Sequence, residues 1–476
     1  MTPDDLLRRR LLQGGLYASG LLLTGCGNST APLSAPAPGT PVPRGPADPR
    51  GVHLSWREDP LTSRTVTWFT DDPATPAQRL DFGPVTSDMS DAMIQNAPFP
   101  ASVTADTSET PFVEAFTHQA TARDLQTDLP MRYRVGSDAG WSPVRVVPPT
   151  PTGDHFRFVH FGDHGRTQDS RNVARAIRRM APDFALLAGD LSYASGSSSL
   201  GPQEVWDEWF DLVEAELGAE TILMTAAGNH ENEGNNGVAY RNRMAMPTST
   251  VSPDGTFYTF QLGRVQFIIS TGGAFATDGT LVTEILFLET QLARAALRRA
   301  AGELDFIVVS QHFTIWTDQE GRGPANFALV ALQENIFVRY GVDLLAVGHD
   351  HIYQRSHPMS FGLRNPLGYV QITSGCGGVG IRGFEPRIQN WSAKELAEPL
   401  FVEYVVSRGR IDAITHGVDS ETGDTHVVDT FTLERRGGEA ASAAVLPVRD
   451  VASLHPDYDR LARRTMFRNR LLLARC

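Results

Sequence analysis

The chain has 476 residues, of which 41% are hydrophobic and 20% are charged, a composition typical of a soluble globular protein with more than one domain. Its formal net charge of −13 excludes a broad electrostatic attraction to nucleic acid, although a local positive centre such as a metal ion could still attract an anionic substrate. Three cysteines are too few for a disulfide framework.

Residues 1–25 have the pattern of an export signal. Three arginines at 8–10 precede an apolar stretch over 11–23, which is too short to span a bilayer comfortably. The segment "RRRLLQ" resembles the twin-arginine export signal, and "LTGC" resembles a bacterial lipoprotein box that ends at Cys26. This resemblance implies an exported protein of the bacterial cell envelope, on its periplasmic or extracellular face, with a lipid anchor at Cys26. An ordinary cleaved signal peptide with an incidental cysteine is the alternative.

Residues 26–49 are rich in proline, alanine, serine and glycine, which predicts an extended tether because such a segment cannot form a core. Residues 50–148 then show the period-two alternation of half-buried strands in "VHLSW", "SRTVTWFT" and "MRYRVGS". Helical periodicity is nearly absent, and proline-rich turns separate the strands. We therefore predict a small all-β domain built as a sandwich.

After a linker over 147–155, short apolar runs alternate with helical patterns, which predicts a layered α/β (α+β) domain over residues 155–436. Helices are expected near residues 169–181, 203–217, 284–300 and 327–340. The tail over 437–476 has no assigned role. Its Cys476 could pair with Cys376, or both could remain free thiols.

Five of the apolar runs end in residues of the types that bind metals. They are Asp163, Asp190, Tyr193, Asn229, His230, His312, His349 and His351. Ligands gather beyond the carboxyl ends of the strands in open α/β sheets, so residues far apart in sequence can converge there. Carboxylates, a phenol, an amide and imidazoles suit hard or borderline metals. There are too many candidate ligands for one metal ion, which indicates two ions. A shared carboxylate is the usual way to hold two ions about 3.5–4 Å apart.

The five segments are "GDHG", "GDLSY", "GNHE", "VSQH" and "GHDH". In this order they resemble the calcineurin-like metallophosphoesterases, and specifically the purple acid phosphatases, over residues 155–435. The preceding β domain resembles the fibronectin-like domain of plant-type members. The resemblance implies a metallophosphoesterase β-sandwich with flanking helices. General members carry a histidine where this chain has Gly165, and Tyr193 is the residue that compensates in purple acid phosphatases.

By this resemblance, a ferric ion would take Asp163, Asp190, Tyr193 and His351. A second ion, zinc, manganese or ferrous iron, would take Asp190, Asn229, His312 and His349. Asp190 would bridge the two ions. A metal-bound hydroxide would attack phosphorus in line, while His230 would face the substrate phosphate beside Asn229 and could donate a proton to the leaving group.

Plant-type members have a further histidine pair after the fourth motif, whereas this chain continues as "HFTIWTDQEGRGPANF". Arg322 in this loop is expected to be a solvated surface arginine, with a phosphate contact as the alternative. His164 is a candidate loop residue near the substrate. His160, inside an apolar strand, is expected to be a core histidine.

The expected function is hydrolysis of phosphate monoesters, with a phosphorylated small molecule as substrate. A phosphodiesterase that acts on nucleotides or lipid head groups through the same site is one alternative. A non-catalytic surface lipoprotein that binds a partner through its β domain is another, although the complete ligand set argues against it.

Overall fold

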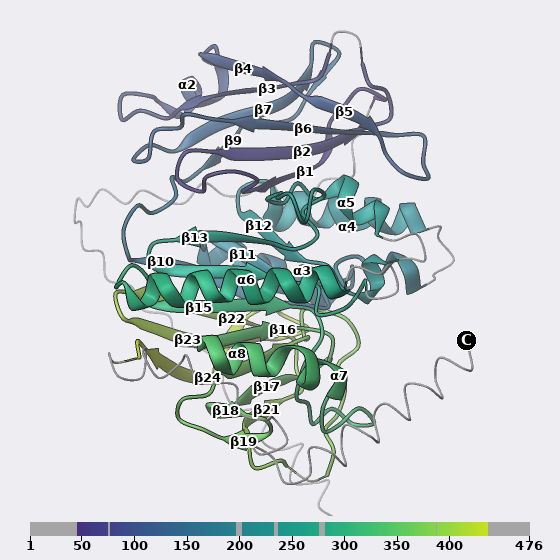
Figure 1. Cartoon of the computed structure of the whole chain (residues 1–476). Coiled ribbons are helices and arrows are strands. Elements are labelled where there is room, and N and C mark those ends of the chain that lie inside the picture. The colour runs from purple at the N-terminus through teal and green to yellow at the C-terminus, as the bar shows by residue number, and fades with distance from the viewer. Residues whose placement is uncertain are drawn as a thin grey trace, which may run out of the picture. The chain divides into compact units, whose positions relative to one another are not determined.

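A computed structural model describes residues 45–74, 77–196, 202–232, 237–275, 281–386 and 388–436 (Figure 1). The predicted export signal, the lipidation site Cys26, nearly all of the tether and the tail with Cys476 lie outside these ranges. Among the described residues, no helix has the length and apolar composition needed to cross a membrane.

The N-terminal region is a sandwich of two antiparallel sheets, as the period-two pattern predicts. Val66, Leu80 and Tyr133 are fully buried in its core. One sheet contains β1 (Arg50–Ser55), β2 (Arg64–Thr70), β6 (Phe116–Ala122) and β5 (Asp106–Glu109). The other contains β4 (Ala101–Thr104), β3 (Arg79–Pro84), β7 (Met131–Ser137), β8 (Gly140–Trp141) and β9 (Arg145–Val147). The short helix α2 (Asp91–Asn96), which the sequence pattern did not indicate, is capped by the side chain of Ser90.

The second region contains two mixed sheets that pack face to face. The first has β10 (Phe156–Phe161), β11 (Phe184–Ala188) and β12 (Ile222–Ala226) in parallel, then β22 (Leu400–Ser407), β23 (Arg410–Val418) and β24 (Thr425–Glu434). The second has β13 (Tyr258–Leu262), β14 (Val265–Ile269), β15 (Phe306–Gln311), β16 (Leu344–Val347), β20 (Val370–Ser374), β17 (Tyr353–Ser356) and β21 (Ser392–Leu396). A small hairpin joins β18 (Met359–Ser360) to β19 (Leu363–Arg364). Aromatic rings fill the space between the sheets, where Phe267 lies edge-on to Phe158 and Phe184 with centroids 5.3 and 5.4 Å away.

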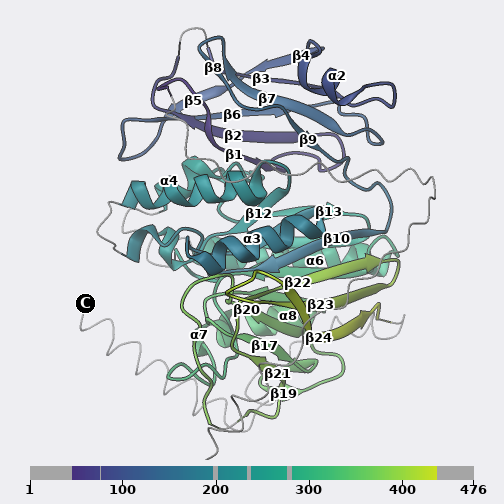
Figure 2. The same cartoon turned by 180° about the vertical axis from the view of Figure 1, so that it is seen from behind.

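Helices cover the outer faces of both sheets, and all four predicted helices are confirmed. Helix α3 (Gln168–Met180) and helix α4 (Pro202–Val213), which continues as a π-helical turn over Glu214–Gly218, lie over the first sheet (Figure 2). Helix α6 (Leu281–Ala300) lies over the second sheet (Figure 1). The last predicted helix consists of α7 (Phe327–Leu329), a π-helical turn over Val330–Glu334 and α8 (Asn335–Tyr340). A short helix, α5 (Val238–Arg243), was not predicted.

The N-terminal sandwich and the α/β region share one sheet. Strand β1 pairs in parallel with β12, with Leu54 opposite Ile222, so a single ten-stranded sheet runs from β24 to β5. The pairing supplies hydrogen-bond partners for an edge of β12 that would otherwise be open. Sequence periodicity predicts the strands but carries no information about this long-range pairing.

His118 on β6 generates a prediction about stability. Its ring is fully buried, with Nε2 2.8 Å from Thr70 Oγ1 and Nδ1 2.8 Å from Thr107 Oγ1. Burial lowers the pKa of His118 from 6.5 to about 4. In the unfolded chain, His118 therefore binds a proton below about pH 6.5, whereas in the folded chain it remains neutral down to about pH 4. This contribution to stability is complete above pH 6.5 and falls by about 2 kcal/mol at pH 5.

His118→Gln should therefore show a smaller loss of unfolding free energy between pH 7 and pH 5 than the wild type, by about 2 kcal/mol. Denaturant unfolding at the two pH values measures this difference. The exposed His155 provides the control, and His155→Gln should behave like the wild type. An equal pH dependence in His118→Gln and the wild type would contradict the prediction.

Candidate active site

The five predicted motifs meet where parallel strands of both sheets end. Asp163, Asp190 and Asn229 follow β10, β11 and β12 of the first sheet, whereas His312 and His349 follow β15 and β16 of the second. Backbone hydrogen bonds fix the strand ends to one another, with Asp163 N donating to Gly189 O over 3.1 Å and Gly348 N donating to His312 O over 3.0 Å. Residues about 190 positions apart in sequence therefore share one site.

The backbone is unusual at four of these positions. Asp163, Asp190, Tyr193 and His349 have φ angles of 55°, 51°, 62° and 68°, in the left-handed region that residues with a side chain seldom adopt. Such conformations persist where the surrounding structure imposes them, and they cluster at functional sites. Close packing adds to the constraint, because a Cβ atom at Gly228 would lie 2.2 Å from Asp190 Oδ1.

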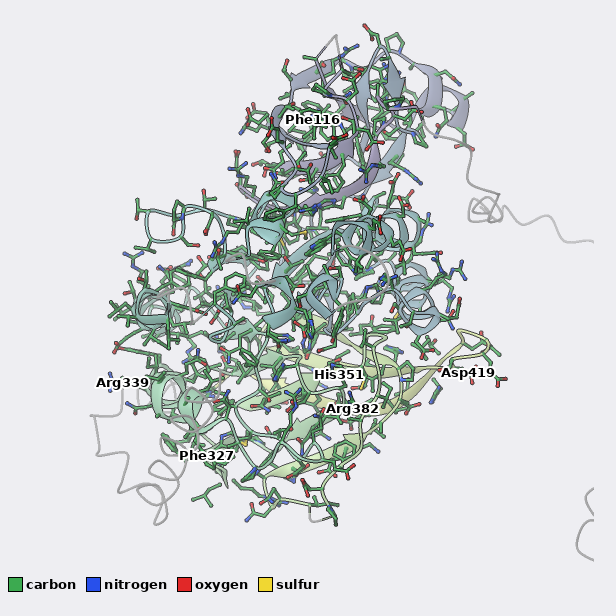
Figure 3. The ribbon with its side chains drawn as sticks, turned by 90° about the vertical axis from the view of Figure 1, so that its right-hand side faces the viewer. Phe116, Phe327, Arg339, His351, Arg382 and Asp419 are labelled. Carbon is green, nitrogen blue, oxygen red and sulfur yellow. The ribbon has the colours of Figure 1, made fainter. Side chains whose placement is uncertain are left out.

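One cluster of ligand-type atoms is formed by Asp163, Tyr193 and His351. Tyr193 Oη donates to Asp163 Oδ1 over 2.9 Å and lies 3.0 Å from His351 Nε2, which is 3.2 Å from Asp163 Oδ1. The other ring nitrogen of His351 lies 3.0 Å from the carbonyl oxygen of Gly380, and Arg382 N donates to the His351 carbonyl (Figure 3). These contacts hold the ring so that Nε2 faces the cluster.

A second cluster surrounds His312. Its Nε2 lies 3.2 Å from Asp190 Oδ2, 3.1 Å from Asn229 Oδ1 and 3.2 Å from His349 Nδ1. Ligand atoms of Asp190, His312 and His349 all lie within 4.8 Å of one another, a spacing at which they could share one metal ion.

The chemistry of the second cluster fits a cation. His312 Nδ1 lies 2.7 Å from the carbonyl oxygen of Ala188 and donates its proton there. In a neutral ring Nε2 would then be an acceptor, and it would face the acceptor atoms of Asp190 and Asn229. Only a positive charge at Nε2 makes this arrangement favourable. Burial lowers the pKa of His312, but the contact with Asp190 outweighs burial and raises it to about 9, so without a metal a proton supplies the charge. A metal ion would replace that proton.

Asp190 belongs to the second cluster and is close enough to influence the first. Its Oδ1 accepts a hydrogen bond from His230 N over 2.8 Å, and its Oδ2 faces His312. On the other side, burial raises the pKa of Tyr193, and the charges of Asp163 and Asp190 raise it further. The carboxylate of Asp190 therefore acts electrostatically on both clusters.

Glu231 holds Asp190 in place, a role that the sequence analysis missed. Its buried carboxylate accepts hydrogen bonds from the backbone N–H groups of Asp190 and Leu191, both over 2.8 Å, and of Gly228 over 2.7 Å. The only signal in the sequence was an acidic residue directly after "GNH", and a charged residue in a loop gave no reason to expect burial.

His230 lies at the open side of the site. Its side chain is 27% exposed, its Nδ1 lies 2.7 Å from Ser195 Oγ, and its ring packs 4.4 Å from the ring of Tyr193. Its Nε2 lies 3.8 Å from Asp190 Oδ2, so this nitrogen faces the two clusters.

Arg322 also lies at the site, and its side chain remains 40% exposed. Its Nη1 contacts Nε2 of His349 and lies 3.1 Å from Oδ1 of the buried Asp350. Sequence alone could not place this residue because its loop has no recognisable periodicity.

His164 lies in the loop after β10, as predicted, but its ring is buried and is not open to a substrate. Its ring is buried, with Nε2 3.0 Å from the carbonyl oxygen of Ser170 and with Nδ1 accepting from Trp209 Nε1 over 3.0 Å. Burial lowers the pKa of His164 to about 4. Both nitrogens are therefore engaged by residues of helices α3 and α4, and neither is available to a substrate.

Three other residues singled out in the sequence, Gly165, His160 and Cys376, are all buried. A Cβ atom at Gly165 would lie 2.4 Å from Val379 and 3.6 Å from the Tyr193 ring, so the side chains of these two residues leave no room for a side chain at this position. His160 is fully buried in β10, as expected of a core histidine. Cys376 is a buried free thiol, and its possible partner Cys476 lies outside the described residues.

Two family models match successive parts of the chain. Residues 49–147 match the N-terminal domain of purple acid phosphatases, and residues 156–353 match the calcineurin-like phosphoesterases. A protein of Mycobacterium tuberculosis (strain ATCC 25618 / H37Rv), described as uncharacterized, is 28% identical over 536 residues and covers 92% of this chain and 97% of its own length. Human acid phosphatase type 7 is 26% identical over 434 residues and covers 82% of this chain and 91% of its own.

The fold is similar to that of a solved purple acid phosphatase from yellow lupin seeds. The TM-score is 0.65 at 17% sequence identity, over 85% of this chain and 78% of the lupin chain. With both domain models matched in succession on this fold, the chain belongs to the purple acid phosphatase-like members of the calcineurin-like metallophosphoesterases.

Proposed function

We propose that the protein hydrolyses phosphate monoesters of small molecules with a pair of metal ions. The observation that carries this proposal is the presence of two clusters of ligand-type atoms, one around Asp163 and one around His312. Asp190 contacts His312 in the second cluster, and its charge acts on Tyr193 in the first. The names of relatives such as acid phosphatase type 7 support the monoester preference.

Asp163, Asp190, Tyr193 and His351 would hold the first ion, which we propose to be ferric iron. Asp190, Asn229, His312 and His349 would hold the second, which we propose to be zinc, manganese or ferrous iron. When bound, such a pair of ions activates a water molecule for in-line attack and neutralises charge on the phosphoryl oxygens.

The protein's own residues orient the substrate and move a proton. Ser195 Oγ, 2.7 Å from His230 Nδ1, fixes the His230 ring with Nε2 toward the site. The proton on His230 Nε2 passes to the leaving alkoxide as the bond to phosphorus breaks. Asn229 supports phosphate binding from the neighbouring position. Backbone bonds to Glu231 keep the loop that carries these residues from shifting.

Cys26 is proposed to carry a lipid that anchors the exported protein to the cell envelope, on the sequence evidence of the box "LTGC". Expressed in a lipoprotein-processing bacterium, the wild type should partition with membranes and carry acyl groups detectable by mass spectrometry. Cys26→Ser should become soluble with unchanged turnover. Membrane association of Cys26→Ser equal to that of the wild type would contradict the anchor.

The shared carboxylate can be tested by Asp190→Asn. An amide cannot bridge two cations, so this variant should lose at least one equivalent of metal and more than about 10³-fold in kcat. Metal analysis and assays with p-nitrophenyl phosphate and bis-p-nitrophenyl phosphate measure both effects. The wild type should prefer the first substrate, and preference for the second would favour the diester alternative.

Asp207→Asn is a matched control for this substitution. Asp207 is a partly exposed carboxylate that pairs with Arg50 over 2.8 Å. This variant should keep its metals and its activity, because exposed ion pairs contribute little to stability. Full metal content and activity in Asp190→Asn would rule out the assigned bridge.

The role of Tyr193 can be tested by colour. A tyrosinate bound to ferric iron absorbs visible light, so Tyr193→Phe should lose the visible band even if iron is still present. Tyr353→Phe is the control, because Tyr353 is also buried and donates to a carboxylate, Asp429, over 2.9 Å. A colourless, iron-free wild type with full activity would contradict the proposed ferric site.

A further inference from the structure

We propose that Arg322 binds a phosphoryl oxygen of the substrate beside His349 and so sets the affinity of the site for phosphate. This inference rests on the proposed function, because it assigns a residue to the same site.

Backbone hydrogen bonds hold the loop over residues 313–326 in a defined conformation. Thr317 N donates to Pro324 O over 3.1 Å, and Asn326 N donates to Ile315 O over 2.8 Å. The tip is closed by Arg322 N, which donates to Gln319 O over 3.1 Å. The loop is therefore a closed hairpin with Arg322 in its terminal turn.

Side chains fasten this hairpin to the core and to the metal-ligand loop. The side-chain oxygen of Gln371 accepts from the backbone of Ile315 and Trp316 over 3.2 and 3.1 Å. Gln319 Oε1 accepts from His351 N over 2.7 Å. The position of Arg322 is thus fixed relative to the residues that we assign to the metals.

Asp350 provides the charge that holds the guanidinium. The Asp350 carboxylate is buried, and its Oδ2 accepts from Thr314 Oγ1 over 2.8 Å. Its Oδ1 lies 3.1 Å from Arg322 Nη1, so this ion pair involves one of the three guanidinium nitrogens. The Arg322 side chain is still 40% exposed, and among the described residues no hydrogen bond from its Nε or Nη2 is found. Donors of a fixed, permanently charged group therefore remain free.

The contact between Arg322 and His349 calls for an acceptor. His349 Nδ1 faces His312 Nε2 over 3.2 Å, where the second ion is proposed, so the ring proton belongs on Nε2. That Nε2 meets Arg322 Nη1, and two donors cannot bond to each other. Both are satisfied when an anionic oxygen lies beside them and accepts from both. A substrate phosphoryl group, held at the adjacent ions, provides such an oxygen.

A purely structural alternative is that Arg322 only neutralises Asp350. The two roles differ in what they change. A structural role would alter stability or metal content, whereas a substrate-binding role would weaken the affinity for phosphate and leave the metal content unchanged.

The test compares Arg322→Ala and Arg322→Lys in the metal-loaded protein. We expect Arg322→Ala to bind inorganic phosphate about 10-fold to 100-fold more weakly by calorimetry and to raise KM for p-nitrophenyl phosphate by a similar factor. Its kcat should change less than its KM, and its metal content should match the wild type. Arg322→Lys should recover part of the affinity, because it restores the charge without the planar fork.

Arg339→Ala is the matched control. Arg339 lies apart from His351 in Figure 3 and pairs with Glu289 over 3.0 Å, so it offers the same chemical change away from the site. It should leave phosphate affinity and KM unchanged.

Wild-type phosphate affinity in Arg322→Ala with both metals bound would overturn the inference. Loss of metal or of melting temperature in both Arg322→Ala and Arg322→Lys, with phosphate affinity per metal-loaded molecule unchanged, would also overturn it in favour of the structural role. If the wild type bound no metal and hydrolysed neither substrate, the proposed function itself would fail, and this inference with it.

Discussion

Three backbone N–H groups, those of Gly228, Asp190 and Leu191, converge on the buried carboxylate of Glu231. These bonds join the ends of β11 and β12 and hold Asp190 in its left-handed conformation. The placement of Asp190 beside His312 follows from that turn, and so does the position of His230, whose backbone donates to Asp190. The rest of the site depends on this one carboxylate, which touches neither substrate nor metal in the arrangement that we propose.

The site also depends on the packing of the two sheets, because each sheet contributes part of each cluster. Tyr193 and Asp163 come from the first sheet, and His351 comes from the second. The aromatic layer around Phe267 sets the separation of the sheets, so the core and the site form one mechanical unit. A substitution that alters the thickness of this layer would change ligand distances several residues away.

Much of the fold could be predicted from sequence because its signals are local. Apolar runs predicted the strands, and helical periodicity predicted helix α3. The residue types at the ends of the apolar runs predicted the candidate ligands. Features created by tertiary contacts could not be predicted. Nothing in the sequence near His164 indicates that Trp209 donates to it, nor that Arg322 meets Asp350. The burial of Glu231 could not be predicted for the same reason, because its hydrogen-bond partners are backbone N–H groups, which are present in any sequence.

The pairing of β1 with β12 gives the N-terminal sandwich a second role. Strand β12 carries Asn229 and Glu231 just beyond its end, and β1 is its neighbour on the side away from β11. A fragment starting after the linker would present β12 as an exposed edge, open to pairing with other chains and free to fray next to the site. The boundary that composition places near residue 150 is therefore a poor place to cut, and exchange of the N-terminal domain between relatives would have to preserve this edge.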